Sequence, residues 1–164
     1  MRKGMSALRL RIAPVLALVL CTFGAAPAAA ADEDVPYWAS IDAEVANMRV
    51  GPGNSYRISW IYRRVQLPVK VLRREGSWRL VQDPEGDRGW MRDLLLSRQR
   101  TAMVTGKGLA DMRKEPSAGS HLQWRVEPGV VGALGECEAD WCEFDAAGHK
   151  GFAPRARLWG TGEP

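Results

Sequence analysis

A short motif that occurs twice constrains the fold of this chain more than any other feature of its sequence. Residues 47–53 and residues 111–116 each carry a Met-Arg pair that is followed by a proline-containing turn. Each copy is followed by a tryptophan and then by a glycine–aromatic pair. The offset between the copies is 64 at Met48/Met112, 63 at Trp78/Trp141 and 62 at Gly89/Gly151. A chain that repeats its layout over roughly 50 residues is built from two copies of one small domain.

The first thirty residues have the pattern of a targeting segment. Four basic residues precede an apolar run from Ile12 to Ala26, and Ala28–Ala30 offers a small-residue cleavage site. We therefore expect residues 1–30 to be a secretory signal peptide, with an uncleaved anchor as the alternative. Cys21 follows Leu20, where a lipoprotein signal needs a small residue, so we expect Cys21 to be removed with the signal.

The charge of the chain changes once this segment is set aside. The chain has 23 Lys and Arg against 19 Asp and Glu, and residues 1–30 hold four of the basic residues and no acidic one, which leaves 19 against 19. The basic balance therefore gives no support for nucleic-acid binding. Residues 37–105 carry twelve basic and seven acidic side chains, residues 106–164 carry seven and nine, and residues 31–38 form a short acidic linker. The two halves could dock on each other, the first could face an anionic partner, or both could simply be solvated.

The hydrophobic pattern after the first thirty residues favours strands. Ile41, Ala43 and Val45 alternate with acidic residues, as in a half-buried strand. Turn-rich segments at 73–77, 83–87 and 138–140 separate short apolar runs, which is typical of hairpins. No segment keeps helical spacing for a dozen positions. We expect two small all-β domains, at 39–96 and 106–160, joined by a linker at 97–105.

Several blocks of the first copy carry a family resemblance. They are residues 47–56, 67–71, 76–81 and 89–91, and in this order they resemble the bacterial SH3-like domain. The second copy departs from it, because Lys114–Ser117 replace the Gly-Pro-Gly loop and Phe152 stands for the second tryptophan. The resemblance implies an all-β fold of two tandem small SH3-like β-barrels, partly open, in the cell envelope. It also implies a targeting module of the kind often attached to wall-processing enzymes, with no catalysis by the domain itself.

The two remaining cysteines flank a tight turn. Cys137 and Cys142 would lie opposite each other on adjacent strands of a hairpin, and secretion would expose them to an oxidising compartment. We expect a structural disulfide. A metal site would need further ligands beside His149, and a catalytic dithiol usually has a closer spacing.

An offset of 63 places Arg74 and Arg79 of the first copy at the positions of these cysteines. Two arginines across a hairpin repel each other modestly. Both side chains could splay into water, or, together with Arg73, they could form an anion-binding edge.

Catalytic groupings are scarce in this sequence. His121 and His149 lie in polar, turn-like contexts, the expected disulfide consumes the thiols, and the acidic residues at 83–87 share one turn. We therefore expect no enzyme activity, no cofactor and no metal.

A binding surface is the remaining expectation. Trp78 and Trp141 have the apolar neighbours of core residues. Tyr56, Trp60 and Tyr62 follow the Gly-Pro-Gly loop among polar residues and could stack on sugar rings or hold an extended peptide. The arginines that could pair with carboxylates are Arg49, Arg63 and Arg64.

We expect the protein to be periplasmic or secreted, with no membrane span after signal cleavage. Two functions fit such a protein. One is a module that binds peptidoglycan or its stem peptides, and the other is a protein–protein adaptor that takes an extended segment. A purely structural role is a third.

Overall fold

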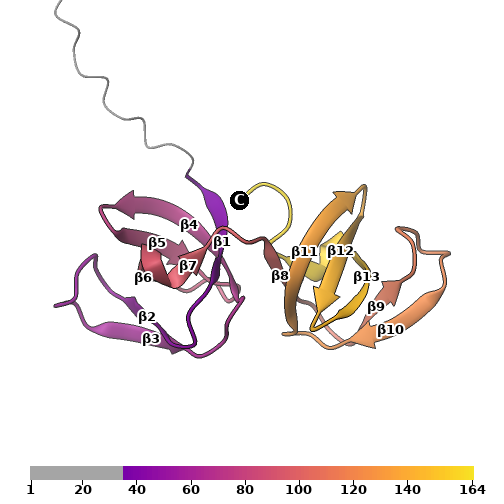
Figure 1. Ribbon diagram of the computed structural model, residues 1–164, viewed down its shortest axis with the longest axis horizontal. Coiled ribbons are helices and arrows are strands. Elements are labelled where there is room, and N and C mark those ends of the chain that lie inside the picture. Colours follow the sequence, from indigo (N-terminus) through magenta and orange to yellow (C-terminus); the bar gives the residue numbers. More distant parts are fainter. Residues whose placement is uncertain (1–34) are drawn as a thin grey trace, which may run out of the picture. The chain divides into compact units, whose positions relative to one another are not determined.

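The structure is a computed structural model that describes residues 35–164. The expected signal peptide, Cys21 and the first acidic residues of the expected linker lie outside this range. The described chain is all-β and forms two seven-stranded antiparallel sheets (Figure 1). Within it, no helix is long and apolar enough to cross a membrane.

Each sheet is formed by one half of the chain. The first contains β1 (Tyr37–Ile41), β2 (Ala46–Arg49), β3 (Ile58–Tyr62), β4 (Pro68–Glu75), β5 (Trp78–Gln82), β6 (Arg88–Arg92) and β7 (Leu96–Ser97). The second contains β8 (Thr101–Val104), β9 (Ala110–Arg113), β10 (Leu122–Val126), β11 (Val131–Glu138), β12 (Trp141–Ala146), β13 (His149–Pro154) and β14 (Leu158–Trp159). Short 3-10 turns, η1 (Asp93–Leu95) and η2 (Arg155–Arg157), precede β7 and β14.

The two sheets have the same topology. The strand order is β3-β2-β6-β5-β4-β1-β7 in the first and β10-β9-β13-β12-β11-β8-β14 in the second, so each strand has a counterpart at the same place. This confirms the prediction of two tandem copies of one small β domain. Neither sheet closes on itself through hydrogen bonds, because β3 and β7 stand at the two ends of the first, as β10 and β14 do in the second. The domains are therefore open versions of the expected barrels.

Three boundaries differ from those that we expected. The alternating segment around Ala43 was expected to be a strand, but β1 ends at Ile41 and β2 begins at Ala46, with bends between them. The expected linker at 97–105 contains β8, which pairs with β11 and β14 of the second sheet. All four residues of β8 are buried, so this strand lacks the alternation by which a half-buried strand is found. In the same way, the expected linker at 31–38 includes the first two residues of β1.

The hairpins follow the repeat. In the first domain β4 and β5 pair with Arg74 opposite Arg79, and in the second β11 and β12 pair with Cys137 opposite Cys142. The offset of 63 therefore identified equivalent cross-strand pairs.

Each domain has its own apolar core, and Met103 and Val131 of the second domain pack into the first core. Met48, Val69, Val71 and Met91 are buried in the first, and the second is built around Phe144. Further core residues of the second domain are Val104, Met112 and Cys142. Trp78 is buried as expected, whereas Trp141 is only half-buried.

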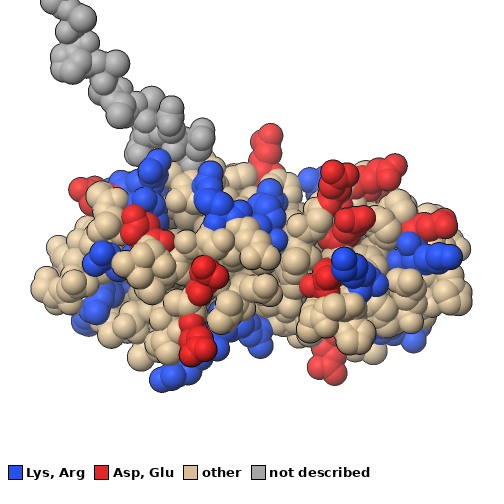
Figure 2. Space-filling model, viewed as in Figure 1, with Lys and Arg blue, Asp and Glu red and all other residues tan. Residues whose placement is uncertain are grey.

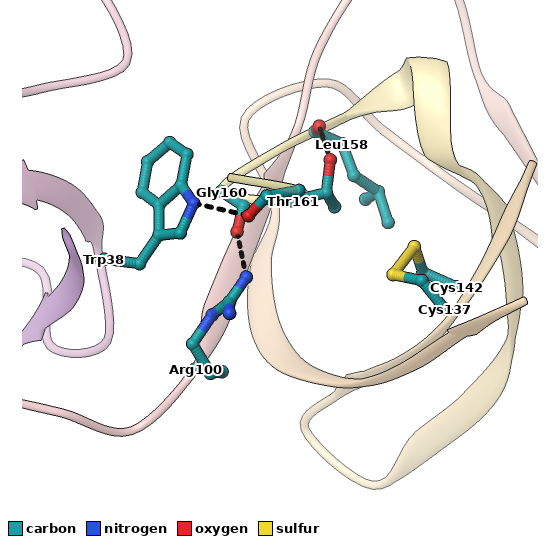
Figure 3. The surroundings of a disulfide bond; sticks show 8 residues. Trp38, Arg100, Cys137, Cys142, Leu158, Gly160 and Thr161 are labelled. Carbon is teal, nitrogen blue, oxygen red and sulfur yellow. Dashed lines mark hydrogen bonds between the residues drawn. A yellow bond between two sulfur atoms is a disulfide. The ribbon is translucent and has the colours of Figure 1, made fainter. Parts of the chain in front are cut away.

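Contacts between the domains come from both ends of the second one. Met103 of β8 packs into the core of the first domain. The ring of Trp38 meets that of Trp159 edge to face, with 4.8 Å between centroids. Nε1 of Trp38 also donates a hydrogen bond of 3.0 Å to the carbonyl oxygen of Gly162 (Figure 3). The guanidinium of Arg100 donates to the carbonyl of Gly160 beside it.

Candidate functional site

The repeated Met-Arg motif has a structural explanation. Met48 and Met112 are fully buried core residues, and the arginine after each lies opposite the aromatic residue of the glycine–aromatic pair, Trp90 or Phe152. Gly89 lies against Met48, where an added Cβ would come within 2.5 Å of its Cγ. Methionine, arginine and glycine therefore recur together because they form the junction between the second and sixth strands of each domain.

The arginine of the motif holds the loop that follows it. Nη1 of Arg49 donates to the carbonyl oxygens of Asn54 at 3.1 Å and of Tyr56 at 2.6 Å. Nη1 of Arg113 donates to the carbonyl of Ser120 at 3.0 Å, although the loop sequence there is different. Arg49 was predicted to pair with ligand carboxylates, but its guanidinium is engaged with backbone carbonyls of its own loop.

The Gly-Pro-Gly segment makes room for an aromatic ring. A Cβ at Gly51 would lie 2.5 Å from the ring of Tyr56, and one at Gly53 would lie 3.2 Å from it. Tyr56, a predicted ligand residue, is exposed on one side and packs on these glycines with the other. Because Gly51 and Gly53 lack a Cβ, the ring of Tyr56 can pack directly against the backbone of this segment.

Four of the predicted ligand residues line one cleft. This cleft, which we call the β3 cleft, has a volume of about 340 Å³. Its lining includes Trp60, Tyr62, Arg63 and Arg64 from β3 and the residues after it. The opposite wall is formed by the turn between β5 and β6 with Asp83, Glu85 and Asp87, and Met103 of the second domain completes the lining. The site therefore combines aromatic side chains with charges of both signs.

A hydrogen bond across the cleft fixes its two walls. The hydroxyl of Tyr62 donates a hydrogen bond to Oδ2 of Asp83 at 2.7 Å. Oδ1 of Asp83 accepts a hydrogen bond from the backbone N–H of Asp87 at 2.8 Å. Burial raises the pKa of Tyr62 above its ordinary value, and the hydrogen bond and charge of Asp83 raise it further, so the phenol stays neutral and donates. Asp83, which the sequence placed in a turn, is a buried part of the cleft.

The two cleft arginines have different surroundings. Nη1 of Arg64 donates to the carbonyl of Gly129 in the second domain at 2.6 Å. Arg63 has no side-chain hydrogen bond or ion pair within residues 35–164. Arg63 is therefore the cleft cation best placed to meet a ligand.

Arg79 has a structural role. It is only 9% exposed, and it donates to the carbonyls of Gly76 at 2.7 Å and Trp78 at 2.9 Å and forms an ion pair of 3.3 Å with Asp93. Of the two interpretations of the Arg74/Arg79 pair, splaying into water is thus wrong for Arg79, whose guanidinium is held by its own chain. Its partner across the hairpin, Arg74, is exposed. Arg73 lies 5.2 Å from the ring of Trp90.

The expected disulfide is present. Cys137 and Cys142 are bonded with their Cα atoms 3.9 Å apart, and Cys142 is fully buried in the second core (Figure 3). The cross-link closes the turn at 139–140.

A second groove, of about 450 Å³, crosses the sheet of the second domain, and the sequence did not reveal it. Its lining includes Phe152, Glu143, Asp145, Lys114 and Lys150. Asp145 and Lys150 lie 4.0 Å apart across its rim. In the face shown in Figure 2, basic and acidic side chains are interspersed over both domains.

The family of the chain follows from a direct comparison. The model of the bacterial SH3 domain matches residues 42–98 and again residues 106–160. The chain belongs to the bacterial SH3 domain family. Both matches fall on the two sheets, so the resemblance inferred from the motif blocks is confirmed, the divergent second copy included. No match was found among the curated proteins.

Among solved structures, the chain is similar to NlpC2 from Trichomonas vaginalis, with 12% identity and a TM-score of 0.35 over 77% of this chain and 48% of the other. It is also similar to an NlpC/P60 family protein from Bacillus cereus, with 15% identity and a TM-score of 0.34 over 75% and 56% of the two chains. The chain spans about half the length of these proteins. TM-scores this low carry no argument about its function.

Proposed function

We propose that this protein is a non-catalytic binding module of the cell envelope whose first domain recognises peptidoglycan or its stem peptides. Membership of the bacterial SH3 domain family supports the envelope setting. The β3 cleft is the observation that carries the ligand class. Trp60 offers an exposed face on which a sugar ring or an apolar side chain can stack, and Arg63 offers a cation for a carboxylate. On the acidic wall, Glu85 and Asp87 complement an amine, while Asp83 is engaged by Tyr62 and the amide of Asp87.

The surroundings of the thiols and histidines support a binding role. The two cysteines of the described residues are joined in the disulfide, so neither can act as a nucleophile. The ring of His149 packs against Trp124 with 5.8 Å between centroids. A module of this kind would bring its partner to the wall without acting on it.

Sedimentation with purified sacculi tests the proposal. The chain without its expected signal peptide, residues 1–30, should sediment with sacculi at low salt; we call it the exported chain. Trp60→Ala should lower the bound fraction at least about fivefold, because an exposed aromatic side chain in a cleft is a typical hot spot for binding. Trp124 is the matched control, since it pairs with Met112 as Trp60 pairs with Met48. Trp124→Ala should leave the bound fraction unchanged once circular dichroism shows that both variants are folded. Failure of the unmodified chain to sediment would refute the proposal.

A further inference from the structure

The edge strand β3 exposes apolar side chains along its length. It stands at the end of the first sheet and pairs only with β2. Ile58 is 39% exposed, Trp60 53% and Ile61 51%. Edge strands of soluble proteins are usually guarded by charges, prolines or bulges, because their unpaired backbone groups attract further strands. The pairing of β3 with β2 has a register irregularity between Met48 and Arg49, but the exposed side chains of β3 are largely apolar, so this edge calls for an explanation.

The equivalent strand of the second domain shows what a guarded edge looks like in the same fold. In β10, half-buried apolar residues alternate with exposed ones, and the exposed positions carry Gln123 and Arg125. Nε of Arg125 donates to Oδ1 of Asp111 at 2.9 Å, which places a charged pair on that edge. The exposed apolar character of β3 is thus a property of the first copy and not of the fold.

The apolar exposure is also concentrated around this strand. Nine large hydrophobic residues of the described chain are exposed, and seven of them lie between residues 45 and 65. They are Val45, Val50, Tyr56, Ile58, Trp60, Ile61 and Val65. Three of them lie on β3 and the other four within about thirteen residues of it in the chain, and a concentration of exposed apolar residues is typical of an interaction surface.

Charge indicates what kind of partner fits. Arg57 and Arg63 stand at the two ends of β3, and neither side chain has a hydrogen bond or ion pair within residues 35–164. In an antiparallel pairing of two copies centred on Trp60, Arg57 would face the Arg63 of the second copy. Like charges directly opposite each other destabilise a strand pair. The edge is therefore poorly suited to a second copy of this chain and well suited to a strand with acidic ends.

We propose that β3 takes an extended segment of a partner protein as an added antiparallel strand. The segment would be acidic at both ends, to pair with Arg57 and Arg63, and apolar at alternate positions between them. Its backbone would complete the hydrogen bonds of β3, and its apolar side chains would cover Ile58 and Trp60. This interaction would give the module a protein partner, and because the added strand would cover Trp60 and Arg63, it would compete with a wall ligand for those two side chains.

The probe is a synthetic nine-residue peptide with alternating valine and threonine at its centre and two aspartates at each end. Binding to the exported chain is followed by the fluorescence anisotropy of a label on the peptide. The peptide should bind saturably. An analogue with lysine in place of each aspartate should bind about tenfold more weakly or worse, which corresponds to about 1.4 kcal/mol. An analogue with prolines at the central positions should not bind, because proline cannot pair with an edge strand in this way.

A pair of matched variants locates the site. Ile58→Lys places a charge on the edge and should weaken peptide binding about tenfold or more, while Leu109→Lys makes the same change at a residue of the second domain that is 53% exposed and should have no effect. Ile58 does not line the β3 cleft, so Ile58→Lys should still sediment with sacculi as the unmodified chain does. The wall proposal and this one can therefore fail separately.

Several results would overturn the inference. These are no saturable binding of the acidic peptide, equal binding of the proline analogue, or peptide binding that Ile58→Lys leaves unchanged. A concentration-dependent dimer in sedimentation velocity that Ile58→Lys abolishes would assign the edge to a second copy instead.

Discussion

Gly89 is the most sharply testable position of the repeated motif, because a single methyl group there meets atoms that cannot easily move. A Cβ at Gly89 would lie 2.5 Å from Cγ of Met48, 3.0 Å from its Sδ and 2.8 Å from the carbonyl oxygen of Arg49. Met48 is packed in the core, and the carbonyl belongs to β2, which meets β6 where Arg49 pairs with Trp90. To accept the methyl group, β2 must move away from β6.

The expected effect of Gly89→Ala follows from these contacts. Overpacking of a filled core costs about 1–3 kcal/mol. Replacing glycine also restricts the unfolded chain, which returns roughly 0.4–1 kcal/mol. We expect a net loss of about 1–2 kcal/mol in the free energy of unfolding. For a chain of this size, that corresponds to a melting temperature lower by roughly 4–8 °C.

The repeat supplies the control for this substitution. Gly151 occupies the equivalent position, but a Cβ there would lie 3.1 Å from Oε1 of Gln123, 3.2 Å from the carbonyl of Arg113 and 3.4 Å from Cβ of Met112. The nearest atom is the end of a flexible side chain, so Gly151→Ala should change the free energy of unfolding by less than about 1 kcal/mol. Urea unfolding followed by tryptophan fluorescence measures both variants. If Gly151→Ala were as destabilising as Gly89→Ala, or if Gly89→Ala were neutral, the account of the motif would be wrong.

Three other predictions concern single side chains. Arg49→Met removes two hydrogen bonds from a charged donor, so we expect a loss of about 1–3 kcal/mol and faster amide exchange in residues 50–57, measured by hydrogen-exchange mass spectrometry. Reduction of the disulfide in the unmodified chain should cost about 2 kcal/mol in urea unfolding, and the double variant Cys137→Ser with Cys142→Ser should lose more, because it also places a hydroxyl in the core at Cys142. The pKa of Tyr62 is higher in the folded protein than in the unfolded chain, where it is about 10. The contribution of Tyr62 to the free energy of unfolding is therefore fully present below about pH 10 and is lost as the pH rises above this value. Alkaline unfolding should therefore be less steep with pH in Tyr62→Phe.

The sequence predicted those parts of the fold that depend on neighbouring residues. Turn residues between short apolar runs located the hairpins, and the offset between the copies correctly set Arg74 opposite Arg79 and Cys137 opposite Cys142. Both inferences need only local geometry, because a hairpin fixes its own register. β8 was missed since its burial depends on strands that lie far along the chain.

The sequence could predict which aromatic and basic residues were candidates for the site, but it could not predict which of them are available to a ligand. Arginine has the same chemistry whether it meets a ligand or a carbonyl of its own chain, so Arg49 and Arg79 could not be told apart from Arg63 before the fold was known. The bond between Tyr62 and Asp83 spans 21 residues and depends on how β3 lies against the turn after β5. The alternation pattern could place Tyr62 on a strand and Asp83 in a turn, but it could not predict that the two side chains meet.

The contacts between the copies bear on why they have diverged. A domain of this size buries only a modest fraction of its surface, and the first copy additionally leaves the apolar side chains of β3 in water. The second copy contributes Met103 to the core of the first and covers Trp38 with Trp159 and the carbonyl of Gly162. These contacts offset part of the stabilisation that the first copy forgoes by leaving the side chains of β3 in water, while the disulfide stabilises the second copy itself. An exposed apolar strand that is unfavourable for its own domain can therefore persist, because the other copy of the duplication supplies apolar contacts that the first copy lacks.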